Sequence, residues 1–167
     1  MILLIDGRSG SGKSELATAL ADHAEVVRLD DVYPGWDGLA AGSALVPGII
    51  RERRYRRWDW ATAGYAEWRE LGDGPLIIEG CGALSQANRL LADFGIWVQH
   101  PTDDRRRRAL VREPDFAAHW DAWAAQEEQF IALEHPRERA DAEVDGRDVT
   151  AELARWRRLL DPARVGE

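Results

Sequence analysis

The hydrophobic residues of the chain form short apolar runs, and these runs alternate with stretches of helical periodicity. Apolar runs that end at turn residues are typical of buried strands. By this criterion the sequence predicts five strands, at residues 1–6, 25–29, 75–79, 94–99 and 142–145. Because predicted helices lie between these strands, we expect an α/β fold with a parallel five-stranded sheet flanked by helices.

Between the strands, apolar residues recur every three or four positions, which favours amphipathic helices. The predicted helices cover residues 14–23, 59–71, 85–93, 102–112, 115–134 and 150–160, with Ser85 as an N-cap. Residues 31–48 are rich in glycine and proline and predict a long loop, a type of segment that often carries function.

Composition narrows the class of protein. The 167 residues are 45% hydrophobic and 31% charged, with a net charge of −8, which favours one domain over residues 1–167 and excludes a disordered chain. Asp6 ends the first apolar run after five residues, too soon for a signal peptide or a membrane span. We therefore expect no membrane partner, and the acidic balance predicts no nucleic-acid partner. The oligomeric state is left as monomer or homodimer.

Cys81 is the only cysteine, so the chain has no intrachain disulfide and no cysteine-based zinc site. A reduced, cytoplasmic compartment is the simplest interpretation. The four histidines have no ligand-like spacing and are expected to be structural or at the surface. By their spacing, Trp120, Trp123 and Trp156 are expected to lie in the core.

Residues 7–14 read GRSGSGKS and match the P-loop pattern G-x-x-x-x-G-K-[ST]. Its glycines allow successive backbone N–H groups to point at phosphate oxygens, and the helix that follows adds the positive end of its dipole. Lys13, the only lysine among 22 basic residues, would reach the β- and γ-phosphates of ATP, and Ser14 would bind Mg²⁺. The expected nucleotide-binding residues are Gly7, Ser9, Gly10, Ser11, Gly12, Lys13, Ser14 and Thr18.

Other features indicate which class of P-loop protein this is. With Lys13 already used, no second lysine exists for the N-K-x-D motif of Ras-type GTPases. The strand at residues 94–99 ends in Gln-His and the strand at 75–79 ends in Glu79, whereas a Walker B strand should end in Asp. What remains is a small kinase in which ATP and an acceptor bind to one compact domain.

Five segments, in the same order along the chain, resemble motifs of uridine kinases and nicotinamide riboside kinases. After the second strand, residues 29–33 read LDDVY and resemble the D-x-F-Y segment, and residues 58–60 read WDW and resemble the acceptor-binding segment. Residues 77–80 resemble V-x-x-E-G, residues 105–113 resemble the arginine-rich lid, and residues 140–146 resemble A-D-x-V-x-x-G before the adenine-contacting loop. The resemblance implies a three-layer P-loop kinase fold with a small helical lid at about residues 102–115.

The resemblance implies that Asp30 is the catalytic base, and its expected position at the carboxyl end of a strand agrees with that role. Asp31 is the adjacent alternative. Glu79 is expected to hold a Mg²⁺-bound water or an acceptor hydroxyl, and Asp59 to hydrogen-bond acceptor hydroxyls. Each of these carboxylates could instead be structural, as an N-cap or an arginine partner. The remaining candidates for acceptor binding are Tyr33, Trp36 and Trp58.

Arg105, Arg108 and Arg112 share one face of the predicted lid helix, where planar bidentate donors suit phosphate oxygens. Arg108 and Arg112 are expected to stabilise the transferred charge and Arg105 to bind ATP; alternatively, the run pairs with nearby carboxylates. The arginines at positions 53, 54, 56 and 57 would line the acceptor pocket if the acceptor is anionic, although a solvated face is the simpler interpretation.

The expected activity is transfer of the γ-phosphoryl of Mg·ATP to a hydroxyl of a small molecule, such as a nucleoside or a nucleoside-like metabolite. The chain is shorter than typical uridine kinases, which predicts that their β-hairpin is missing. Gluconate-like or shikimate-like acceptors therefore stay open, as does a regulatory module that binds ATP without an acceptor.

Overall fold

The computed structural model describes residues 1–151 and 153–161, so the part of the predicted domain outside these ranges is not described. The central sheet has five strands in the order β2-β5-β1-β6-β7, and all neighbours are parallel. The strands are β1 (Ile2–Asp6), β2 (Glu25–Arg28), β5 (Leu76–Glu79), β6 (Phe94–Gln99) and β7 (Ala142–Asp145). The predicted fold class and all five predicted strands are confirmed.

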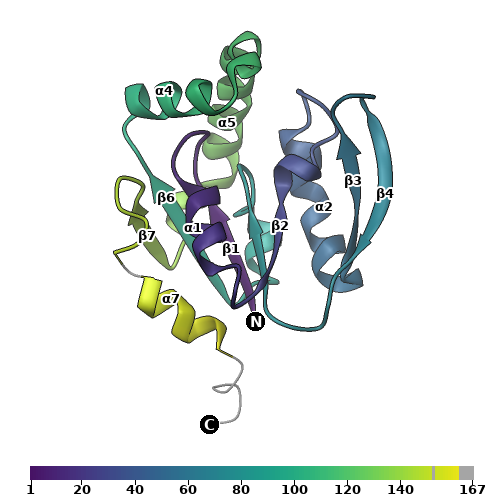
Figure 1. Cartoon of the computed structure of the whole chain (residues 1–167), viewed down its shortest axis with the longest axis vertical. Coiled ribbons are helices and arrows are strands. Elements are labelled where there is room, and N and C mark those ends of the chain that lie inside the picture. Colours follow the sequence, from purple (N-terminus) through teal and green to yellow (C-terminus); the bar gives the residue numbers. More distant parts are fainter. Residues whose placement is uncertain (152, 162–167) are drawn as a thin grey trace.

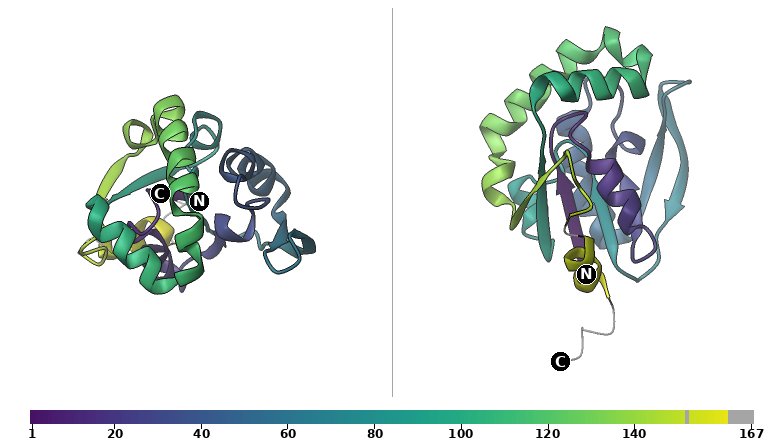
Figure 2. Two further views of the ribbon diagram at one scale, coloured as in Figure 1. Left: turned by 90° about the horizontal axis from the view of Figure 1, so that it is seen from above. Right: turned by 60° about the vertical axis from the view of Figure 1, so that its left-hand side comes forward.

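The sheet separates two hydrophobic clusters because side chains alternate along each strand. On β1, Leu4 belongs to one cluster, whereas Leu3 and Ile5 belong to the other. The first cluster lies against α2 (Leu39–Glu52) and α5 (Trp120–Glu134), and the second against α1 (Lys13–Leu20) and α7 (Leu153–Leu160). Helices thus cover both faces, as Figures 1 and 2 show.

The predicted lid is α4 (Thr102–Arg112), which lies across the upper end of the sheet in Figure 1, beyond the carboxyl end of β6. The 3₁₀ segment η2 (Pro114–Ala118) connects α4 to α5. The long helix predicted at residues 115–134 is therefore broken at His119 into η2 and α5. Its tryptophans Trp120 and Trp123 are buried as predicted, as is Trp156 in α7.

Residues 59–71 do not form the predicted helix. They form most of a β-hairpin, with β3 (Arg54–Asp59) antiparallel to β4 (Gly64–Glu70). Aromatic residues favour strands, and the two strands are joined by cross-strand pairs such as Trp58 with Tyr65. The helical spacing of Trp60, Gly64, Trp68 and Leu71 was misleading. The chain therefore has a β-hairpin, but nothing in the structure identifies it with the hairpin of uridine kinases, so the absence of that hairpin stays a prediction.

The predicted loop at residues 31–48 is wrong over its second half, which belongs to α2. Pro47 lies inside this helix and has no N–H to donate to the Ser43 carbonyl. That carbonyl instead accepts a hydrogen bond from the Asn88 amide at 3.2 Å. The proline is tolerated because another element satisfies the carbonyl, and a sequence pattern does not reveal such a partner.

The remaining helices differ from prediction mainly in length. The helix expected at residues 85–93 is only α3 (Gln86–Arg89), with Ser85 as its predicted N-cap accepting from Asn88 N. The other short elements are η1 (Leu29–Asp31) and α6 (Pro136–Arg139). The last helix begins at Leu153 rather than at residue 150, and residue 152 lies outside the described residues. Among the described helices, none is long and apolar enough to cross a membrane.

Candidate active site

The predicted P-loop follows β1 and leads into α1. Gly10 and Gly12 have positive φ values of 78° and 108°, a backbone conformation that favours glycine. A Cβ atom on Gly10 would also clash with the carbonyl of Arg105 in α4, so the loop packs directly against the lid helix. The Lys13 side chain is almost buried, and its Nζ donates to the Arg8 carbonyl at 3.2 Å. The loop is thereby closed around the lysine.

A cavity of about 620 Å³ lies over this loop and beneath α4. It brings together nine of the predicted site residues, namely Ser9, Gly10, Gly12, Lys13, Ser14, Asp30, Glu79, Arg108 and Arg112. Eight residues that were not predicted as part of the site also line it: Glu15, Cys81, His100, Asp104, Arg107, Ala109, Val111 and Arg147. Residues from several helices, strands and loops thus converge on the loop that the motif identified.

Ser14 and Glu79 are the residues expected to hold Mg²⁺. Glu79 is 1% exposed, and its Oε1 is buried without a hydrogen-bond partner. Burial raises the pKa of Glu79, and nearby Asp30 adds to the rise, whereas Lys13 and the Ser14 hydroxyl oppose it. An unpartnered carboxylate oxygen beside a hydroxyl suits Mg²⁺ that keeps several waters and phosphate oxygens as ligands. The described residues contain no cluster of three or more His, Cys, Asp or Glu side chains that could hold a metal without such ligands.

A second cavity, of about 230 Å³, opens beside the first. Half of its lining residues are aromatic, and the full lining is Ser9, Asp30, Asp31, Tyr33, Trp36, Trp60, Arg112, Glu113, Phe116 and Trp123. The Trp36 ring stacks on His119, with ring centroids 3.9 Å apart, and on Phe116, with centroids 5.6 Å apart. Ser9, Asp30 and Arg112 line both cavities.

Asp30 lies in η1, immediately after β2, at the junction of the two cavities. Its backbone carbonyl accepts a hydrogen bond from Trp60 Nε1 at 2.8 Å, which fixes the segment to the hairpin. Its carboxylate accepts no hydrogen bond from another described residue. Asp31 lines only the aromatic cavity, and burial followed by the charge of Asp30 raises its pKa.

The three lid arginines, predicted to act on one face, have different partners. Arg105 is buried and donates to the Ser9 carbonyl at 3.1 Å, but it does not line either cavity. Arg108 donates to both carboxylate oxygens of Glu15, at 2.8 and 2.6 Å. Arg112 lines both cavities, and its guanidinium makes no hydrogen bond or ion pair with another described residue. Of the three, Arg112 is therefore the guanidinium most available to a ligand.

Some predicted site residues lie away from both cavities. Trp58 packs edge-on against Tyr65 with centroids 5.1 Å apart, and Asp59 accepts from Ala61 N and the Thr62 hydroxyl at the hairpin tip. These hydrogen bonds, led by the one from Thr62, lower the pKa of Asp59. Thr18 donates to the Ser14 carbonyl at 2.6 Å.

Three further predicted residues are buried. Tyr33 lines the aromatic cavity, but its buried hydroxyl donates to the Cys81 carbonyl at 2.7 Å. Gly7 lies at the start of the loop, and its N–H donates to the Asp6 carboxylate at 2.6 Å. Ser11 Oγ is buried without a partner. Gly7 and Ser11 do not line either cavity.

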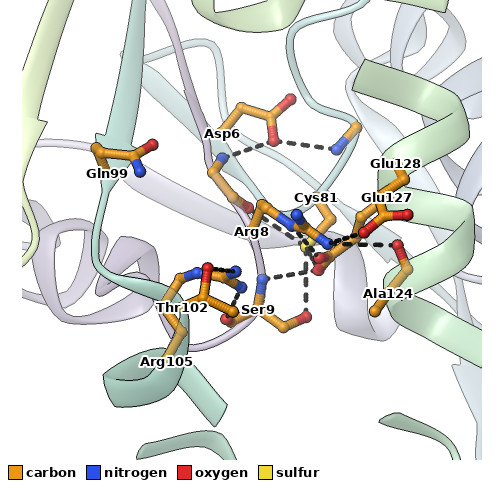
Figure 3. A network of polar contacts seen from close by, with 12 residues as sticks. Asp6, Arg8, Ser9, Cys81, Gln99, Thr102, Arg105, Ala124, Glu127 and Glu128 are labelled. Carbon is orange, nitrogen blue, oxygen red and sulfur yellow. Dashed lines mark hydrogen bonds and ion pairs between the residues drawn. The ribbon is translucent and has the colours of Figure 1, made fainter. Parts of the chain in front are cut away.

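Two buried carboxylates that hold the loop were missed. Asp6 accepts hydrogen bonds from the N–H groups of Gly7, Gly82 and Leu84, and burial raises its pKa to about 6 against the effect of these bonds. Glu127 of α5 accepts from Arg8 Nε at 2.9 Å and from Ser9 N at 2.7 Å (Figure 3). Asp6, at the end of the first predicted strand, could have been suspected, whereas the sequence holds no signal for Glu127.

No family model and no curated protein matches this chain. Solved structures match over most of their length. A "possible uridine kinase" from Bacillus stearothermophilus has a TM-score of 0.59 at 21% identity and covers 87% of this chain and 88% of its own. A gluconokinase from Sinorhizobium meliloti 1021 has a TM-score of 0.54 at 19% identity and covers 95% and 94%. A shikimate kinase from Acinetobacter baumannii, in complex with shikimate, has a TM-score of 0.57 at 15% identity and covers 98% and 94%. This chain thus has the fold of the P-loop small-molecule kinases, as the resemblance implied.

Proposed function

We propose that the chain is an ATP-dependent kinase that transfers the γ-phosphoryl group of Mg·ATP to a hydroxyl of a small molecule. The observation that carries this proposal is the meeting of two cavities at Ser9, Asp30 and Arg112. One cavity contains the P-loop and the other contains aromatic walls. A carboxylate and a guanidinium at their junction are the groups that phosphoryl transfer between two bound molecules requires.

In this proposal the P-loop amides and Lys13 bind the phosphates, and Asp30 accepts the proton of the attacking acceptor hydroxyl. Arg112 donates to the oxygens of the phosphoryl group in transit, where added positive charge stabilises the transition state. Arg108 joins it if the phosphates displace Glu15. Ser14 and Glu79 would hold Mg²⁺, which supplies charge neutralisation at the β- and γ-phosphates when bound.

The lining of the aromatic cavity favours an uncharged planar acceptor, such as a nucleoside, over a sugar acid. Three carboxylates line it, those of Asp30, Asp31 and Glu113, against one guanidinium, that of Arg112. An anionic acceptor would meet net repulsion there, whereas a ring could pack against Trp36 and Phe116. The four hairpin arginines considered for an anionic acceptor do not line this cavity.

Those arginines are held by the hairpin and its surroundings. Arg53 donates to the Gly72 and Gly74 carbonyls, and Arg57 pairs with Glu67 at 2.9 Å. Arg54 lies over the Trp68 ring and Arg56 over the Tyr65 ring. These contacts favour a structural role for the four arginines over acceptor binding, whereas the simpler interpretation of the sequence was a solvated face.

The proposal is tested by ADP release from Mg·ATP in the presence of single acceptors. We expect turnover with at least one neutral nucleoside, such as uridine, and much less with gluconate or shikimate. Turnover with a sugar acid alone would contradict the proposed class of acceptor but support the kinase activity. If the protein binds ATP but releases no ADP in response to any hydroxyl compound, the proposed kinase activity is wrong. The chain would then be a regulatory module that binds ATP. The proposal keeps the cytoplasm as the compartment, because the only cysteine is a free thiol.

A further inference from the structure

Ser9 is held from two sides by charged side chains, one from the lid helix α4 and one from α5. Its backbone N–H donates to Glu127 of α5 at 2.7 Å, and its carbonyl accepts from Arg105 of α4 at 3.1 Å. Figure 3 shows these two side chains reaching Ser9 from different helices. Both residues follow Ser9 by more than 90 positions, so the P-loop is fixed by contacts that its own motif does not contain.

Glu127 is suited to this contact because its carboxylate is buried and fully partnered. The residue is 3% exposed, and its second oxygen accepts from Arg8 Nε at 2.9 Å. Cys81 Sγ adds a contact at 3.2 Å. Burial opposes ionisation, yet the hydrogen bonds from Arg8 and Ser9 hold the pKa of Glu127 below its ordinary value. The group is therefore an ionised acceptor whose hydrogen bonds are stronger than those of a neutral one.

The contact between Glu127 and Ser9 matters because of where Ser9 lies. Ser9 lines both cavities, and the amides that would cradle phosphates follow it directly in the loop. Trp123, one helical turn before Glu127 on α5, lines the aromatic cavity. One helix thus holds the loop at one position and forms the acceptor wall at the other.

We propose that Glu127 and Arg105 clamp the Ser9 peptide and hold the P-loop in its phosphate-binding shape before nucleotide arrives. Glu127 is then a positioning residue that acts through Ser9. A loop ordered in advance does not lose conformational entropy on binding, so the clamp increases affinity for phosphates. This inference rests on the proposed role of the P-loop in binding ATP.

The charge of Glu127 and its contact with Ser9 predict opposite effects on ATP affinity when Glu127 is replaced. Its carboxylate is near enough to Lys13 to raise the lysine pKa, together with Cys81 and Glu79, against the effect of burial. If only charge mattered, removing this negative group would strengthen the binding of anionic ATP. If the clamp matters more, removing it would weaken ATP binding.

The experiment compares Glu127→Gln with Glu128→Gln. Glu128 contacts the same Arg8 guanidinium at 3.4 Å but is exposed and does not touch Ser9, so it removes an equal charge without opening the clamp. Calorimetry with Mg·ATP and no acceptor should give a dissociation constant about tenfold higher for Glu127→Gln, the effect of losing one hydrogen bond to a charged group. Glu128→Gln should bind as the wild type does. Equal or tighter binding by Glu127→Gln would overturn the clamp.

Amide hydrogen exchange gives a second readout that needs no nucleotide. The peptide that contains Ser9 should exchange faster in Glu127→Gln than in wild type or Glu128→Gln, because its N–H loses an ionised acceptor. Unchanged exchange would contradict the clamp. If wild type binds no ATP, the proposed function fails, and the exchange comparison still decides the clamp.

Glu127→Asp covers the case in which Glu127→Gln does not fold. It keeps the charge but withdraws the carboxylate from Ser9 by one methylene. The clamp predicts weaker ATP binding and faster exchange for this variant too, whereas charge alone predicts no change.

Discussion

The two cavities that meet at Asp30 are built in different ways. Five of the residues that line the larger one, Lys13 among them, come from the P-loop stretch of residues 9–14. The smaller one is assembled from η1, the hairpin, η2 and α5, and aromatic side chains form its walls. A backbone cradle suits any polyphosphate, whereas side chains from separate elements can change with the acceptor. The comparison indicates that phosphate binding and acceptor selection can be altered separately.

The largest expected effect comes from a substitution in the P-loop. Lys13→Ala removes the buried ammonium, the only one in the chain, that the loop encloses. We expect ATP binding to fall below detection, a loss of at least about a hundredfold, because a charge-assisted contact to phosphate is lost at a desolvated site. Calorimetry with Mg·ATP checks this, with circular dichroism as the control for folding. ATP binding within a factor of a few of wild type would show that the loop is not the phosphate site.

The next effect comes from the junction. Asp30→Asn keeps the shape of the side chain but cannot accept the hydroxyl proton. We expect turnover with the best acceptor to fall by roughly 10²–10⁴-fold, the usual contribution of a general base, while ATP affinity stays the same. Full turnover by this variant would rule out Asp30, and Asp31→Asn is the matched variant for the adjacent carboxylate.

A smaller effect is expected from the lid. Arg112→Ala should lower kcat by about tenfold or more, towards the lower end for a transition-state donor because Arg112 is exposed to solvent screening. Arg108→Ala should have less effect, since Arg108 is paired with Glu15. Steady-state kinetics separates kcat from the KM for ATP. An equal fall in kcat and in ATP affinity would show ordinary ground-state contacts.

The smallest effect is expected from the aromatic wall. Trp36→Leu should raise the KM of a nucleoside acceptor by roughly three- to tenfold, as the loss of one aromatic contact does, and leave the KM for ATP unchanged. Trp58→Phe is the control, because Trp58 lies outside both cavities. A larger rise in acceptor KM for Trp58→Phe would show that acceptors bind along the hairpin instead.

The difference between a site built from one segment and a site assembled from several elements also explains which features the sequence could predict. The parallel sheet and the P-loop follow from local signals, namely apolar runs and a contiguous motif. The hairpin did not, because Trp60 and Trp68 fit a helical spacing as well as they fit a strand. Trp60 was expected on one face of a helix, yet it lines the aromatic cavity and donates a hydrogen bond to the Asp30 carbonyl.

The other features that the sequence did not predict depend on long-range contacts. Phe116 and Trp123 reach the aromatic cavity, and Glu127 reaches Ser9, because η2 and α5 follow α4 and pack beside the carboxyl end of the sheet. Arg105 and Arg108 share a helical face, as predicted, but one meets a carbonyl and the other a carboxylate. Spacing along a helix predicts which side chains share a face, whereas the partner of each side chain depends on the residues that pack against that face.

The most direct test of the junction is a crystal structure of the protein with Mg²⁺ and a non-hydrolysable ATP analogue. The account predicts that the γ-phosphate lies between Lys13 and Arg112 and faces Asp30 and the aromatic cavity. A γ-phosphate directed towards His100 and Arg147, which line the larger cavity but not the aromatic one, would contradict it.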